Sequence, residues 1–290
     1  EALEAPASGG DPAAGSRVTL KAEGVRLSDA IQQLQKQSGN PITDLREQYG
    51  AEVTNPSFDL DLEDVPFFEA LDRIAKLGGV STTTFTGDGS IGLMAAEGAE
   101  ADQAPVRYVG AFRVALKQFT QQRDFSTGTS AANAVIEVAW EPRLRPMLLS
   151  LKSEGLAVQD DQGRPIMPQV AMEANDVVLR PENPSAEINV NLQAPDRSAQ
   201  RLARFRVKAE VTVPAEMQTF RFPSLRESKT IQQGDVGVTL EGVEVDEQVW
   251  NVGVVLNYPG AGPAFESYRQ GLFNNRLWLQ KADGSRFEQN

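Results

Sequence analysis

The densest group of side chains that could hold a metal is a run of carboxylates, Asp59, Asp61, Glu63 and Asp64. Several oxygens gathered on a bent loop would bind a hard cation such as calcium. The first three alternate instead along a predicted strand, about 6.6 Å apart by the rise of a strand, and no glycine-containing loop interrupts them. We therefore expect a solvated strand face, no metal site and no cofactor.

A second acidic pair, Asp160 and Asp161, is half of what a carboxylate-only hydrolase would need. Glycoside hydrolases, for example, use two carboxyl groups about 5–9 Å apart. The sequence does not identify a distant partner for either residue. The pair begins the segment Asp-Asp-Gln-Gly, in which an Asp caps its own turn, so a hairpin turn is expected and the hydrolase stays an alternative.

Basic side chains recur at Arg201, Arg204, Arg206 and Lys208, the last three on the outer face of one predicted strand, 204–213. Such a stripe would bind an acidic protein or a polysaccharide. The acidic front of the same chain is another candidate partner, and protection of a strand edge is the structural alternative. We take Arg204, Arg206 and Lys208 as a candidate interaction surface.

Trp278 is the fourth candidate interaction residue. Leu277 and Leu279 would face one side of a predicted strand and Trp278 the other side. Tyr258 and Tyr268 lie on nearby segments. Exposed aromatic rings stack on sugar rings, so a carbohydrate-binding site is one interpretation. Packing at the edge of a sandwich is the other.

The residue types that are missing exclude several chemistries. The chain has 290 residues with no histidine and no cysteine. A Ser–His–Asp triad, a thiolate nucleophile and a His- or Cys-ligated metal are therefore impossible. No catalytic motif replaces them, so we expect a protein that is not an enzyme.

The net charge of −12 is uneven, because residues 1–100 carry 17 acidic and 7 basic side chains, a net of −10. Phosphate binding needs clustered Lys and Arg, which argues against nucleic acid and anionic lipid as partners. No apolar run approaches the ~20 residues of a membrane helix. Residue 1 is Glu, so we expect a processed chain from which a signal peptide or anchor has been removed.

Residues 17–96 contain one sequence pattern twice, offset by 40 positions. Each copy has an alternating strand, an amphipathic helix and a glycine stop. We expect two βαβ units related by a pseudo-twofold, with helices near 27–37 and 66–77. The residues that correspond include Leu20 and Leu60, Val25 and Val65, Ala30 and Ala70, Ile31 and Leu71, Leu34 and Ile74, and Gly39 and Gly79.

The segments Gly24-Val25-Arg26-Leu27 with Ala30-Ile31, and Val65-Pro66-Phe67 with Ala70-Leu71, form a motif at each helix start. Residues 17–95 thereby resemble the short N-terminal (STN) domain of secretins and TonB-dependent receptors. Residues 44–50 depart from that pattern as an insertion, and the chain lacks a secretin ring domain. The resemblance implies an exported protein, periplasmic or on the cell surface, that uses the module alone for protein–protein contact.

Elsewhere the chain predicts a tether at 1–16, an acidic linker at 97–105, and β-structure from 106 onward. Period-two alternation there predicts antiparallel sheet, with Trp140 and Trp250 facing inward and a bulge at Gly242. Residues 106–290 are expected to form one or two β-sandwiches. The fold class is thus α+β, a small duplicated βαβ domain followed by an antiparallel β-sandwich region.

These features lead to one functional expectation and two alternatives. We expect a non-enzymatic cell-envelope protein that contacts one or more unknown envelope proteins through its STN-like module. The first alternative is a module that binds carbohydrate or cell wall, with a polysaccharide as partner. The second is the carboxylate-only hydrolase.

Overall fold

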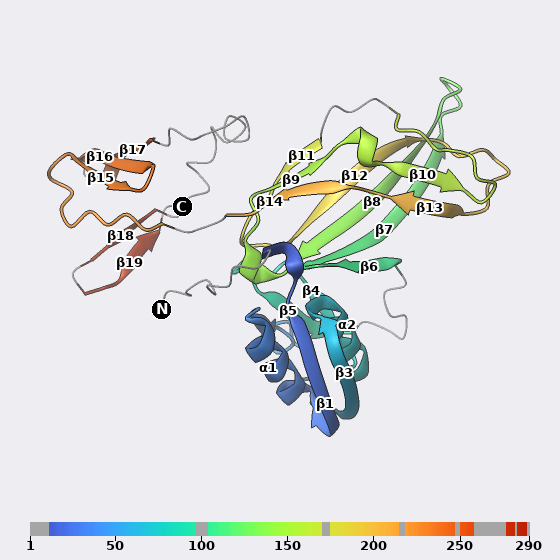
Figure 1. Ribbon diagram of the computed structural model, residues 1–290, viewed down its shortest axis with the longest axis horizontal. Helices are drawn as coiled ribbons and strands as arrows, with labels where there is room; N and C mark the ends of the chain where they lie inside the picture. The colour runs from blue at the N-terminus through green and yellow to red at the C-terminus, as the bar shows by residue number, and fades with distance from the viewer. Residues whose placement is uncertain are drawn as a thin grey trace. The chain divides into compact units, whose positions relative to one another are not determined.

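A computed structural model describes residues 12–96, 104–169, 175–214, 218–246, 250–257, 277–281 and 283–288. The described part is mostly β, with two α-helices and several sheets (Figure 1). The chain forms two compact units, Glu1–Pro214 and Ala215–Asn290. Neither helix is long and apolar enough to cross a membrane.

The front of the first unit contains the duplicated pattern. Its elements are β1 (Arg17–Arg26), α1 (Leu27–Ser38), β2 (Ile42–Asp44), β3 (Ser57–Pro66), α2 (Phe67–Gly78), β4 (Val80–Thr83) and β5 (Ile91–Ala95). Both predicted helices are confirmed, and β3 and α2 repeat the bounds of β1 and α1 at an offset of 40 residues. However, β1 pairs with β3, whereas β2 lies in a separate sheet of order β2-β5-β4. Neither copy therefore forms a βαβ unit within one sheet.

The β1–β3 ladder has the register of a pseudo-twofold. Val18 pairs with Val65, and the pair that corresponds to it after exchange of the copies, Phe58 with Val25, is also present. The helix starts are reciprocal as well. The N–H of Leu27 donates to the carbonyl of Pro56 at 3.0 Å, and that of Phe67 donates to the carbonyl of Ser16 at 3.0 Å.

A matching bulge interrupts each strand just before its helix. Gly24 and Asp64 occupy equivalent positions there with φ of 61° and 51°, the left-handed region that glycine tolerates best. The N–H of Gly24 donates to Oδ1 of Asp59 at 2.8 Å, and the N–H of Asp64 donates to Oγ1 of Thr19 at 3.1 Å. Each copy therefore supplies the side chain that caps the bulge of the other.

The helices pack against each other and against the β1–β3 ladder (Figure 1). Both end at a left-handed glycine, Gly39 and Gly79, as the sequence predicts. Their predicted apolar faces are also confirmed as buried. The buried apolar side chains of the two helices are Leu27, Ala30, Ile31 and Leu34 in α1, and Phe67, Phe68, Ala70, Leu71, Ile74 and Ala75 in α2.

The rest of the first unit is an antiparallel sandwich. One sheet has the order β12-β8-β7-β6, and the other layer consists of the sheets β11-β9-β14 and β10-β13, with one apolar core between the layers (Figure 1). The bounds are β6 (Val106–Val109), β7 (Phe112–Arg123), β8 (Ser130–Trp140), β9 (Leu148–Leu151), β10 (Ala157–Asp160), β11 (Asn175–Val178), β12 (Ser185–Gln193), β13 (Leu202–Arg206) and β14 (Ala209–Thr212). Trp140 is in this core, 1% exposed, as predicted.

The single strand predicted over 204–213 is wrong. The chain pairs with β10 up to Arg206 and pairs with β9 from Ala209 onward. Strands β13 and β14 therefore belong to different sheets. The break lies at Lys208, whose N–H donates to the carbonyl of Gly155 at 2.9 Å. Period-two alternation continues through the break, and for that reason the sequence does not reveal it.

The second unit contains a sheet of order β15-β16-β17 and a hairpin of β18 and β19. Their bounds are β15 (Lys229–Gln233), β16 (Val236–Val245), β17 (Trp250–Asn257), β18 (Trp278–Gln280) and β19 (Arg286–Glu288). The register shift next to Gly242 confirms the predicted bulge. Trp250 is 57% exposed, so its predicted core position is wrong. It pairs with Val245 at the far end of the ladder, beyond the bulge, where Val245 is itself exposed.

The front domain is fixed to the sandwich by a buried carboxylate. Glu141 is fully buried and accepts hydrogen bonds from the Ser16 N–H at 2.6 Å, Asn40 Nδ2 at 3.0 Å and Arg143 Nε at 2.6 Å. Ala139 of β8 belongs to the apolar core of the front domain. Two residues expected in the tether therefore contact the sandwich: Ser16 hydrogen-bonds Glu141, and the Ala13 carbonyl accepts the Ala111 N–H at 3.1 Å. The described contact between the front domain and the sandwich runs through β7 and β8, at Arg113 and Ala139, and an attraction to the Arg204 stripe stays a prediction.

Candidate functional site

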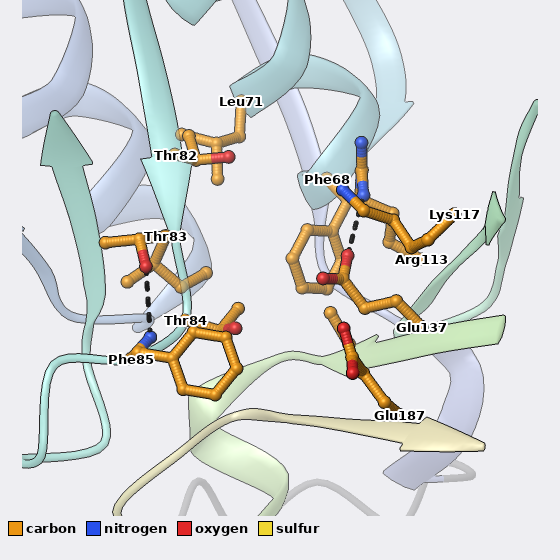
Figure 2. Close-up of a pocket in the computed structure, with 12 residues that line it drawn as sticks. Phe68, Leu71, Thr82, Thr83, Thr84, Phe85, Arg113, Lys117, Glu137 and Glu187 are labelled. Carbon is orange, nitrogen blue, oxygen red and sulfur yellow. Dashed lines mark hydrogen bonds and ion pairs between the residues drawn. The ribbon is translucent and has the colours of Figure 1, made fainter. Parts of the chain in front are cut away.

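A cleft of about 290 Å³ lies between the front domain and the outer face of the β12-β8-β7 sheet (Figure 2). Its front-domain wall comes from α2, from the end of β4 and from the residues that follow β4, with Phe68, three consecutive threonines (82–84) and Phe85. Its floor carries charged side chains of the sheet. The cleft is therefore half apolar and half ionic.

Local contacts hold the front-domain wall in place. Gly89, in the loop before β5, donates its N–H to the carbonyl of Glu182 at 2.9 Å and has φ of 80°. A Cβ at Gly89 would lie 2.4 Å from the carbonyl oxygen of Pro181, so only glycine permits this approach. The Thr84 hydroxyl also hydrogen-bonds that of Ser185 on β12. These contacts position Phe85, which is 63% exposed, at the mouth of the cleft.

Arg113 links the front-domain wall of the cleft to its floor. Its Nε donates to Oδ2 of Asp72 in α2 at 2.9 Å, and its Nη1 donates to Oε1 of Glu137 in β8 at 3.2 Å. The Tyr108 hydroxyl donates to the same Asp72 oxygen at 2.7 Å. Burial, together with this carboxylate, raises the pKa of Tyr108 well above its usual range. The guanidinium is thus a structural bridge that also forms part of the floor.

Glu137 and Glu187 are directly opposite each other on β8 and β12. Cross-strand partners share one face of a sheet, and Figure 2 shows both side chains on the cleft side, across from Phe85. Lys117 from β7 lines the same space. Sequence reasoning places both glutamates on outward phases of their strands. It misses the pair because the register of strands 50 residues apart is not encoded locally.

The arrangement suits binding of a polar ligand. Carboxylate and hydroxyl oxygens accept hydrogen bonds, Arg113 and Lys117 donate them, and the Phe85 ring offers an apolar face. Glu137 is already engaged by Arg113.

A second feature distinguishes the two edges of the β1–β3 ladder. At the edge of β1, the side-chain amide of Gln37 accepts from the Thr19 N–H at 3.0 Å and donates to the Thr19 carbonyl at 2.9 Å. The residues equivalent to Gln37 and Thr19 in the second copy are Leu77 and Asp59. Leu77 is 48% exposed and has no amide to offer. One edge is thus closed by a side chain, and among the described residues no side chain hydrogen-bonds the backbone of Asp59 in the same way.

The acidic run of β3 is explained by structural contacts. Asp59 caps the bulge at Gly24, and Lys21 lies 3.6 Å from Asp61 and 2.6 Å from Glu63. Asp64 is the bulge residue itself. Within the described ranges, no three acidic side chains are grouped to hold a metal. The absence of metal and cofactor stays a prediction.

The other acidic pair forms the expected turn. Oδ1 of Asp160 accepts the N–H groups of Gln162 and Arg164, both at 2.9 Å, and Oδ2 accepts Arg164 Nε at 2.7 Å. Burial opposes ionisation, but these hydrogen bonds outweigh it and hold the pKa of Asp160 below its usual value. Asp161 accepts the N–H of Gln200.

The four candidate interaction residues are divided between the two compact units. Arg204, Arg206 and Lys208 are exposed, alternate with half-buried Phe205, and lie in the first compact unit. Trp278 lies in the second unit. It is half-buried, and the guanidinium of Arg286 lies over its ring at 4.9 Å. Tyr258 and Tyr268 are outside the described residues.

The cleft, with Glu137, Glu187 and Phe85, and the open edge beside Leu77 are therefore the two features with functional potential. Comparison of the chain with protein-family models, with curated proteins and with solved structures finds no match.

Proposed function

We propose that the protein is a non-enzymatic component of the cell envelope, periplasmic or on the cell surface, that contacts a partner protein through its STN-like front domain. The reciprocal contacts of β1, β3 and the two helix starts support a duplicated unit, as the resemblance implies. The single observation that carries the contact function is the difference between the two edges of the β1–β3 ladder.

A strand edge with unpaired N–H and C=O groups is a template for another strand. At Thr19 the Gln37 amide occupies that position. By the symmetry of the ladder, Asp59 presents the equivalent backbone groups beside Leu77, an apolar side chain on the surface. We propose that an extended strand of the partner pairs with β3 at Asp59 and covers Leu77. Main-chain hydrogen bonds and one apolar contact are the usual elements of such β-augmentation.

The test uses the internal symmetry as its control. A photo-reactive amino acid replaces Arg73, one helical turn before Leu77, or Gln33, the equivalent residue of the first copy; both positions are exposed. In cells that produce the full chain, we expect a cross-linked partner from position 73 and none from position 33. The substitution Leu77→Gln should close the edge as Gln37 does and abolish the cross-link without lowering the melting temperature. An equally strong cross-link with Leu77→Gln would overturn the proposal.

A further inference from the structure

The outer face of the β12-β8-β7 sheet beyond the cleft is lined mainly by neutral polar side chains. Ladder partners there form three successive rows from β7 through β8 to β12. We call this surface the amide face. Its rows are Gln118, Val135 and Asn189, then Thr120, Asn133 and Asn191, then Gln122, Ala131 and Gln193.

The side chains of the amide face are accessible. All three β7 residues and all three β12 residues are exposed, and the β8 residues between them are half-buried. The opposite sides of the same strands carry the sandwich core, such as Ile136 and Val190. Segment 167–169 pairs with the outer edge of β12, since Gln193 donates its N–H to the Met167 carbonyl at 2.8 Å. The face is therefore an accessible surface that segment 167–169 bounds on one side.

Solubility alone does not account for this composition. The exposed face of the β1–β3 ladder carries Lys21, Glu23, Asp59, Asp61 and Glu63, the usual charged surface. The nine positions of the amide face include no charged side chain. A face without Lys and Arg does not suit nucleic acid, and a face without large apolar anchors does not suit a protein hot spot.

The neutral amides match a polyhydroxylated ligand. Each Asn or Gln side chain both donates and accepts hydrogen bonds, as a sugar hydroxyl does. Neighbouring strands lie about 4.8 Å apart, and alternate residues along a strand lie about 6.6 Å apart, so several of these groups are close enough together to hydrogen-bond neighbouring sugar rings. The amide face also continues into the cleft, because the next row contains Glu137 and Glu187 and leads to the exposed ring of Phe85.

We propose that the amide face and the adjoining cleft bind a neutral glycan chain, with the ring of Phe85 stacking on one sugar at the end of the row. The site is distinct from Trp278, and it is independent of the strand edge at Leu77. A protein with both sites would hold a protein partner and a polysaccharide together.

The test uses the full chain and a panel of neutral hexasaccharides built from glucose, N-acetylglucosamine or mannose. We expect at least one of them, at millimolar concentration, to shift the side-chain amide NMR signals of Gln118, Asn189 and Asn191. The double substitution Gln118→Ala/Asn189→Ala should weaken that binding about tenfold, and Phe85→Ala should weaken it as well. Neither amide makes a hydrogen bond within the described structure, so the double variant should fold.

The matched control is Gln32→Ala/Gln33→Ala, which removes two exposed amides from α1 and should leave the affinity unchanged. Three results would overturn the proposal: no response to any member of the panel, shifts confined to residues away from β7, β8 and β12, or unchanged affinity in the β7/β12 double variant. Binding restricted to an anionic polymer such as polygalacturonate would also contradict it, because the face is neutral.

Discussion

Two residues 40 positions apart, Gly24 and Asp64, share the left-handed backbone conformation of the β1 and β3 bulges. Asp tolerates that region better than most residues, yet it costs more there than glycine does. The side chain of Asp64 makes no hydrogen bond within the described structure, whereas its N–H is held by Thr19. The second copy thus keeps the bulge with a residue that the backbone does not favour.

We therefore predict opposite effects for the same substitution at two nearby sites. Asp64→Gly should leave the free energy of unfolding unchanged or raise it by up to about 1 kcal/mol, because relief of strain exceeds the entropic cost of glycine. Asp61→Gly, in ordinary strand conformation, should cost about 0.5–1 kcal/mol. Urea denaturation of both variants is the measurement, and a larger loss at position 64 than at 61 would contradict the interpretation of the bulge.

At the scale of single elements, α2 has two leucines in contrasting environments. Leu71 is 1% exposed and packs in the front-domain core, whereas Leu77 is 48% exposed. Both lie in the same helix, so helix propensity affects them equally. A substitution to alanine at each site therefore isolates the contribution of burial.

We predict that Leu71→Ala lowers the free energy of unfolding by about 2–5 kcal/mol. Leu77→Ala should change it by less than about 0.5 kcal/mol, since surface substitutions rarely do more. Urea melts of the two variants give the comparison. Equal losses would show that the buried face of α2 is wrongly assigned.

Periodicity identifies the faces of elements but not their neighbours. The i, i+3, i+4 spacing of Leu27, Ala30 and Ile31 predicts the buried face of α1 because a helix fixes those positions locally. Nothing local brings Glu187 opposite Glu137, or Gln37 to Thr19. Those contacts depend on strand register and on packing between elements. The two helices of the front domain and their buried faces were thus predictable, whereas its strand pairing and the contacts of both candidate sites were not.

The two wrong predictions, for Trp250 and for the strand over 204–213, also show that periodicity does not identify the neighbours of a strand. Alternation is present in both stretches, but exposure depends on whether a second layer covers the face. Trp250 pairs with Val245 at an end of the ladder where both are exposed. The break at Lys208 is set by a contact with Gly155, more than 50 residues away, which no local pattern encodes.

At the scale of the whole molecule, Glu141 joins the front domain to the sandwich. Its carboxylate is fully buried and satisfied by Ser16, Asn40 and Arg143, from the two sides of the contact. Loss of one partner from a buried, hydrogen-bonded charge cluster leaves the others unpaired. The front domain and the sandwich should therefore unfold together only while this carboxylate is present.

We predict that Glu141→Ala destabilises the first unit by about 3–5 kcal/mol and separates its unfolding into two steps. Native-state hydrogen exchange should show amides of α1 and of β8 opening with one free energy in the original protein and with two in the variant. Glu52→Ala, which removes an exposed carboxylate from the front domain, should leave a single step. One shared free energy in both variants would mean that apolar contacts such as Ala139 suffice.

The reciprocal contacts of the front domain have a consequence for its origin. Each copy caps the bulge of the other and accepts the first helical N–H of the other, so neither copy is complete alone. The two copies are thus related as the protomers of an isologous homodimer are, within one polypeptide. Fusion makes the association independent of concentration and releases the halves from identical sequence. One half can then have Gln37, which closes its strand edge, while the other has Leu77 at the equivalent position. Two identical protomers cannot differ in this way.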